Sequence, residues 1–141
     1  MILYVDTSAL VKLYVPEPES GAVQTLLESA QVAAVSLVAF AEARAAFARK
    51  RRERAVNPKY YLRIVREFDG DWDHYFVVNV TEPLVKRAAQ LADKHGLRGY
   101  DAIQLSSAIV LREQSSEAVT FCCFDGRLLR ASRREGLKPA L

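Results

Sequence analysis

The chain has 141 residues, of which 50% are hydrophobic and 26% are charged, and its formal net charge is +3. This length suits one domain with its own core, and the apolar content excludes a disordered chain. The longest segment without a charge, Ser29–Ala41, is too short to cross a membrane, and the N-terminal segment Met1–Asp6 lacks the features of a signal peptide. We therefore expect a single domain over residues 1–141 that resides in the cytoplasm.

The first half of the chain predicts strands that alternate with helices. A continuous apolar run over 2–5 predicts a strand buried on both faces. Ser8 is placed to cap a helix that reaches Tyr14, where Pro16 and Pro18 end it. The patterns that follow predict a helix over 20–30, a strand over 32–35, a long helix from a cap at Ser36 to about Arg54, and a helix that begins at Asn57-Pro58.

The second half continues this alternation. It predicts strands over 76–80 and 119–124, a weak edge strand over 137–141, and helices over 81–95, 100–114 and 126–135. Thr81 opens the first of these helices and Gly96 closes it. Cys122 and Cys123 are neighbours in a strand and point to opposite faces, so we expect no disulfide between them. The alternation of strands and helices predicts an α/β fold with a parallel sheet covered on both faces.

Four acidic residues stand alone in apolar or basic surroundings: Asp6, Glu42, Asp101 and Asp125. Asp6 and Asp125 follow predicted strands, and ligands of an open α/β sheet bind beyond the carboxyl ends of its strands. Asp101 lies in a first helical turn, where the helix dipole favours an anion. Glu42 lies on a helix face of valine and alanine, where glutamate is rare. Taken singly, Asp101 is equally well a helix-end charge and Glu42 a surface partner of an arginine, but four acids placed in this way favour a shared site.

A shared acidic site indicates a divalent cation. Clustered carboxylates resist ionising together, and a hard cation relieves their repulsion. Mg²⁺ prefers oxygen ligands and Mn²⁺ suits the same donors. We expect Asp6, Asp101 and Asp125 to bind the ion directly or through water, with Glu42 completing the acidic pocket and Ser8 hydrogen-bonding a carboxylate or a water beside it. Such an ion activates water and neutralises charge on a phosphodiester, which indicates hydrolysis of a polyanion.

A run of basic residues continues the helix that carries Glu42. A basic run beside isolated acids is compatible with a nucleic acid partner, and a solvated helix face explains it equally well. The positions that we expect to track an RNA backbone are Arg44, Arg49, Arg51 and Arg52.

Four segments each carry one of the four acids: Tyr4–Tyr14, Ser36–Arg44, Gly99–Leu105 and Thr120–Leu128. In this order and spacing, over nearly the whole chain, they resemble the motifs of the PIN-domain family, and specifically its VapC-type toxins of bacterial toxin–antitoxin pairs. The resemblance implies a PIN-like three-layer α/β/α domain with a central parallel sheet of four to five short strands. It places the four acids at the family's four acidic positions, and Ser8 at the small polar position after the first acid. One departure is Cys123, where related sequences often carry a small hydroxyl residue.

The resemblance also implies a function and partners. Members of this family are described as Mg²⁺- or Mn²⁺-dependent ribonucleases, which often dimerise and which a cognate antitoxin holds inactive. By resemblance we expect an endoribonuclease toxin with an RNA substrate, a VapB-like antitoxin and a homodimeric state. The RNA backbone and the antitoxin are equally suited to the basic run that begins at Arg44.

Two other functions remain open at the level of sequence. One is a HAD-like phosphoryl-transfer enzyme with Asp6 as nucleophile, although such enzymes commonly carry a second aspartate where this chain has Ser8. The other is a non-catalytic RNA-binding module that retains the acids as vestiges. The RNA that is cleaved and the number of ions do not follow from the sequence.

Overall fold

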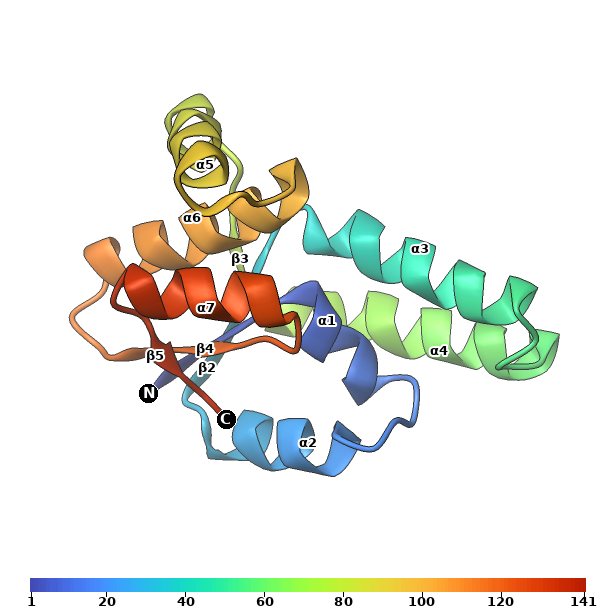
Figure 1. The fold of residues 1–141 in the computed structure, drawn as a ribbon. Helices are drawn as coiled ribbons and strands as arrows, with labels where there is room; N and C mark the ends of the chain where they lie inside the picture. The colour runs from blue at the N-terminus through green and yellow to red at the C-terminus, as the bar shows by residue number, and fades with distance from the viewer.

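The computed structural model describes residues 1–141, and its centre is one sheet of five parallel strands in the order β3-β2-β1-β4-β5 (Figure 1). The strands are β1 (Ile2–Val5), β2 (Val32–Ser36), β3 (Phe76–Val78), β4 (Val119–Cys122) and β5 (Lys138–Pro139). In the register, Leu3 of β1 lies opposite Ala33 on one side and Thr120 on the other. The first strand of the sequence is therefore the central strand of the sheet.

Helices cover both faces of this sheet, so the three-layer α/β/α arrangement expected from the resemblance is confirmed. The helices are α1 (Thr7–Leu10), α2 (Ser20–Ser29), α3 (Ala39–Arg52), α4 (Pro58–Asp71), α5 (Glu82–His95), α6 (Gly99–Gln114) and α7 (Gly126–Arg134), with short 3₁₀ helices η1 (Val11–Leu13) and η2 (Trp72–His74). None of these helices has the length and hydropathy needed to span a membrane.

Each face of the sheet carries its own hydrophobic core, because successive residues of a strand point to opposite faces. Tyr4 joins the core under α5, α6 and α7, and Leu3 joins the core under α1 to α4. Cys123 belongs to the first core and Cys122 to the second, and both thiols are free. The prediction that these cysteines form no disulfide is confirmed.

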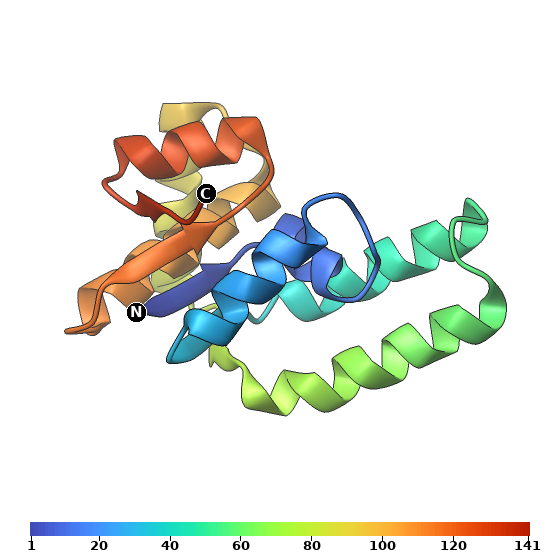
Figure 2. The same ribbon diagram turned by 90° about the horizontal axis from the view of Figure 1, so that it is seen from below.

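The helices α3 and α4 run antiparallel and extend together to one side of the sheet (Figure 2). Aromatic side chains hold this hairpin together: the rings of Phe47 and Phe68 lie 5.4 Å apart and both residues are fully buried. Nearer the sheet, the ring of Trp72 meets that of Phe40 edge-on at 5.0 Å. This packing fixes the position of α3, and with it the position of Glu42.

The prediction that Ser8 caps the first helix is wrong. The N-cap of α1 is Asp6, whose side chain accepts a hydrogen bond from the backbone N–H of Ser8 at 3.1 Å. Aspartate is as good a cap as serine and comes first in the chain, so Ser8 lies inside the helix. The helix is also shorter than predicted, since after Leu10 it tightens into η1.

Three further boundaries differ because sheet pairing overrides local signals. Ser36 is predicted to cap a helix, but it is the last residue of β2, where it pairs with Val78, and α3 begins at Ala39 without a side-chain cap. The strands predicted over 76–80 and 119–124 each end two residues early, at Val78 and Cys122. The neighbouring strands offer no pairing beyond those two residues.

Local capping signals predict two other helices correctly. Asn57 caps α4 by accepting a hydrogen bond from the N–H of Tyr60 at 2.8 Å. Thr81 caps α5, which ends at Gly96 with a left-handed φ of 65°. These signals succeed because each involves residues only a few positions apart.

Candidate active site

Asp6 lies at the carboxyl end of the central strand, directly after Val5, and is 4% exposed. Its Oδ2 accepts hydrogen bonds from Ser8 Oγ at 2.6 Å and from Ser8 N at 3.1 Å. The hydrogen bond from the Ser8 hydroxyl to a carboxylate, expected from the sequence, is therefore present. The other oxygen, Oδ1, accepts no hydrogen bond from the protein, which leaves it available as a ligand.

Glu42 is held by a polar network that joins α3, α6 and β1. Its Oε1 accepts hydrogen bonds from Thr7 Oγ1 at 2.9 Å and from Gln104 Nε2 at 2.8 Å. Gln104 is 1% exposed, and its Oε1 accepts a hydrogen bond from the hydroxyl of Tyr4 at 2.6 Å. Its Nε2 also lies 3.0 Å from Thr7 Oγ1, so both ends of the amide are engaged. The interpretation of Glu42 as the surface partner of an arginine is wrong.

The other two acids lie at the beginnings of helices. Asp101 is half-buried in the first turn of α6, and Asp125 is exposed at the N-cap of α7, where its Oδ1 accepts a hydrogen bond from Leu128 N at 2.9 Å. Because β4 ends at Cys122, Asp125 follows its strand by three residues rather than immediately. Asp125 therefore lies at the solvent-exposed rim of the group, and Asp6 at its buried centre.

The electrostatics couple the four acids to one another. Burial raises the pKa of Asp6 to about 6; the hydrogen bonds from Ser8 oppose this rise, and the charges of Glu42 and Asp101 add to it. Burial also raises the pKa of Asp101, as does the charge of Asp125, while Arg98 lowers it. The structure thus gathers residues from four separate segments into one coupled group at the carboxyl end of the sheet.

The carboxylates do not form a closed cage for an ion. No group of three or more His, Cys, Asp or Glu side chains lies close enough together to hold a metal ion in common. Mg²⁺ usually takes one or two carboxylates and keeps several waters, so it needs no such cage. The Oδ1 of Asp6, which accepts no hydrogen bond from the protein, is free to serve as one such carboxylate ligand. A cation beside Asp6 also favours its charged form against the burial that raises its pKa.

Cys123 takes the place of the hydroxyl residue that related sequences often carry. Its Sγ accepts a hydrogen bond from Asp125 N at 3.2 Å and lies 3.8 Å from Ser8 Oγ. Phe124 N in turn donates to Ser8 Oγ at 3.0 Å. Burial raises the pKa of the Cys123 thiol far above its ordinary value, so the thiol stays neutral. Cys123 and Ser8 together fix the loop that leads from β4 to Asp125.

Most of the arginines predicted to contact RNA have partners within the protein. Their contacts are Arg44 with Asp69 at 3.0 Å, Arg49 with Glu53 at 2.8 Å, and Arg51 over the ring of Tyr61 at 4.4 Å. The fourth arginine, Arg52, is exposed at the end of α3 and makes no ion pair. Exposed ion pairs of this kind are weak, so contact with RNA stays a prediction for this surface.

Sequence reasoning missed three residues that shape the site. Thr7 and Gln104 bind Glu42, and Arg98 lies close enough to Asp101 to lower its pKa. The signal for Gln104 is its spacing of three from Asp101, which places both on one face of a helix that is otherwise largely buried.

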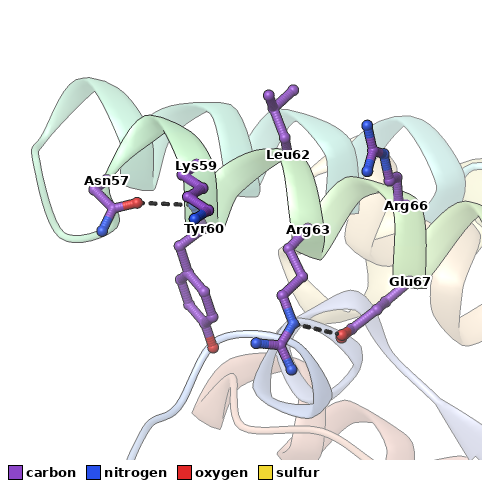
Figure 3. A pocket seen from close by; sticks show the side chains of 7 residues that line it. All are labelled: Asn57, Lys59, Tyr60, Leu62, Arg63, Arg66 and Glu67. Carbon is purple, nitrogen blue, oxygen red and sulfur yellow. Dashed lines mark hydrogen bonds and ion pairs between the residues drawn. The ribbon is translucent and has the colours of Figure 1, made fainter.

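The four acids and the larger of two cavities lie in different parts of the molecule. A cavity of about 740 Å³ lies along α4, and all seven lining residues, Asn57 to Glu67, belong to that helix and its N-cap (Figure 3). It contains none of the four acids. A smaller cavity of about 350 Å³ is lined by Asp101 and Asp125 together with Arg98, Arg127 and Arg130. Two of the four acids therefore line the smaller, wholly charged cavity, and none of them lines the larger one.

Comparison with known families identifies this arrangement. The family model described as "PIN domain" matches residues 3–133, which is nearly the whole chain. The chain belongs to the PIN-domain family. The resemblance stated from the four acidic motifs, to PIN domains and to the VapC proteins among them, is thereby confirmed.

Individual relatives agree with the PIN-domain assignment. Ribonuclease VapC45 of Mycobacterium tuberculosis is 29% identical over 139 residues, which cover 99% of this chain and 94% of that protein. FitAcB from Neisseria gonorrhoeae superposes with a TM-score of 0.68 at 19% identity, covering 99% of this chain and 96% of the other. A toxin–antitoxin complex from Klebsiella pneumoniae gives a TM-score of 0.63 at 18% identity, covering 87% of this chain and 86% of the other. At such identities the two solved structures show the shared PIN fold.

Proposed function

We propose that this PIN domain is a metal-dependent endoribonuclease with Mg²⁺ or Mn²⁺ as cofactor, and that it is the toxin of a toxin–antitoxin pair. The observation that carries the proposal is the coupling of Asp6 with Glu42 and Asp101 at the carboxyl end of the sheet. The burial of Asp6, its free Oδ1 and the negative charge of the two further acids beside it support a cation at this place. The name of the relative VapC45, a ribonuclease, supports RNA as the substrate.

Each acid has its own role in this proposal. Asp6 and Asp101 would hold the ion directly or through water, and Asp125 would support it from the exposed rim. When bound, the ion supplies positive charge beside the phosphodiester and lowers the pKa of water. Glu42 keeps Oε1 on Thr7 and Gln104 and uses Oε2 to orient the attacking water. No side chain needs to form a covalent bond with the RNA.

The partners follow from the same assignment. We infer that a VapB-like antitoxin holds the enzyme inactive and that the protein is a homodimer. The likeness in fold to a chain of a toxin–antitoxin complex supports the antitoxin. A VapC-type protein of this kind acts in the cytoplasm, where its RNA is found.

The decisive experiment compares Asp6→Asn and Asp101→Asn with the wild-type protein on RNA in Mg²⁺ or Mn²⁺. Both variants are expected to lose about 10²–10³-fold in cleavage rate, because each removes charge from the site. The matched control is Asp93→Asn, which removes an exposed acid of α5 outside the site and leaves cleavage unchanged. Chelation with EDTA abolishes wild-type cleavage and added Mn²⁺ restores it. Unchanged cleavage by both site variants defeats the proposal.

The alternatives make different predictions in the same preparation. Phosphoryl transfer through Asp6 requires a phosphorylated intermediate, which mass spectrometry detects after incubation with acetyl phosphate. A non-catalytic RNA-binding module predicts that Mn²⁺ neither binds nor raises the Tm. The ribonuclease predicts no phosphorylated Asp6 and a Tm that rises with Mn²⁺.

A further inference from the structure

A charged pocket lies where α6 and α7 begin. Its cavity of about 350 Å³ is within the range of pockets that bind small ligands, roughly 300–1,000 Å³. Its walls contain no hydrophobic residue. The residues that line this charged pocket are Arg98, Asp101, Asp125, Arg127 and Arg130.

Two segments of the chain, the starts of α6 and α7, place the arginines there. Arg98 is the N-cap residue of α6. Arg127 and Arg130 lie three residues apart near the start of α7, so they share one face of that helix. Arg127 Nη1 donates a hydrogen bond to the carbonyl of Gly96 at 3.3 Å, and Arg130 Nη1 lies 3.4 Å from the position that a Cβ would take at Gly126. The fold thus concentrates three guanidinium groups beside the acids.

The arginines of the charged pocket keep most of their donors free. None of them makes an ion pair, although Asp101 and Asp125 line the same cavity. Asp125 uses Oδ1 to cap α7. Each guanidinium has five N–H donors, and the structure occupies only one of them on Arg127. In contrast, three of the four arginines on α3 are already engaged.

The three guanidinium groups outnumber the two carboxylates of this pocket, and none of them makes an ion pair, so together they favour an anion with several oxygens. Guanidinium groups match phosphate, which accepts two parallel hydrogen bonds from one arginine. Asp101 belongs both to this pocket and to the proposed metal site, so an anion held here lies beside the bond that is cut. The anion that every RNA strand brings to that place is a phosphate of its backbone.

We propose that the charged pocket binds a backbone phosphate of the RNA substrate through Arg98, Arg127 and Arg130. This inference rests on the proposed ribonuclease function and assigns the RNA contact to the starts of α6 and α7 instead of to α3. The contact positions the strand without reading its sequence, because phosphates are the same at every nucleotide.

The test measures binding of a short fluorescein-labelled single-stranded RNA by fluorescence anisotropy, in EDTA so that no cleavage occurs. Arg98→Ala, Arg127→Ala and Arg130→Ala are each expected to weaken binding by about five- to tenfold. The slope of log Kd against log salt concentration falls by about 0.7 for each phosphate contact that is lost. The matched control is Arg133→Ala, which removes an exposed arginine of α7 outside the pocket and leaves Kd unchanged. Circular dichroism verifies that all four variants are folded.

The outcomes separate this inference from the proposed function. Equal binding by wild type and the three pocket variants overturns the inference, as does an equal loss in Arg133→Ala or a wild-type protein that binds no RNA. Unchanged RNA binding with lost affinity for purified antitoxin also overturns it and assigns the pocket to the protein partner. If binding falls as expected but the wild type cuts no RNA with any divalent ion, the phosphate site stands and the ribonuclease proposal fails.

Discussion

Replacing Gln104 by leucine removes the centre of the network that holds Glu42. Leucine fills a similar volume, so the change removes hydrogen bonds and little packing. The hydroxyl of Tyr4, which is fully buried, loses its acceptor at 2.6 Å, which costs about 1–2 kcal/mol. The cost of the lost acceptor stays at the lower end of this range because Ser36 and Ser107 also lie beside the Tyr4 hydroxyl. The lost bond to the half-buried carboxylate of Glu42 adds about 1 kcal/mol, so Gln104→Leu costs about 2 kcal/mol in all.

A double-mutant cycle with Tyr4→Phe tests this reasoning. Tyr4→Phe alone is expected to cost about 1 kcal/mol, and the double variant costs about 1 kcal/mol less than the sum, since both partners of one buried bond are then absent. Urea unfolding at pH 7, followed by the fluorescence of the single tryptophan, gives the four free energies of unfolding. Costs that add to within about 0.3 kcal/mol would refute the network as the source of stability.

Three further predictions concern the site and the cores. The folded pKa of Asp6, about 6, lies above its ordinary 3.8, so the ionised carboxylate lowers stability above pH 6 and this cost disappears below about pH 4. Asp6→Asn should therefore be about 3 kcal/mol more stable than wild type at pH 7 and nearly equal in stability at pH 4. The free energies of unfolding come from urea denaturation without metal ions. An equal difference between the two proteins at both pH values contradicts this prediction. Phe68→Ala should cost about 3–5 kcal/mol, because Phe68 is fully buried among aromatic rings, whereas Leu62→Ala, at an exposed site, should change the unfolding free energy by less than about 0.5 kcal/mol. Burial raises the pKa of Cys122 to about 11 and that of Cys123 further, so iodoacetamide at pH 8 should label neither thiol in the native protein and both in urea, as mass spectrometry will report.

The order of strands and helices can be predicted from the sequence because the signals that set it are local. The apolar run that ends at Asp6 predicts the buried central strand, and Asn57 and Gly96 mark a helix start and a helix end through contacts a few residues long. The prediction for Ser36 is wrong because the contact that decides its structure is distant in the sequence. Its local signal is a helix cap, but pairing with Val78, 42 residues away, keeps it in the sheet.

The same distinction applies to the site. The four acids stood out because each is isolated in the sequence, and the structure gathers them at one end of the sheet. The contacts of Gln104 span 62 residues to Glu42 and 100 to Tyr4, and no local pattern encodes them. The ion pair between Arg44 and Asp69 joins two helices, and no local pattern predicts it either. Arg44 of α3 is therefore less free to bind a partner than the sequence indicates.

Asp6 and Asp125 each have two roles: each caps the N-terminus of a helix, and each contributes negative charge. Asparagine caps helices as well as aspartate does. An aspartate codon becomes an asparagine codon by exchange of a single base. A gene for this protein thus lies one nucleotide away from an allele whose product keeps a helix cap at that position and lacks one of the four carboxylates, so the acidic group can be altered without loss of the fold.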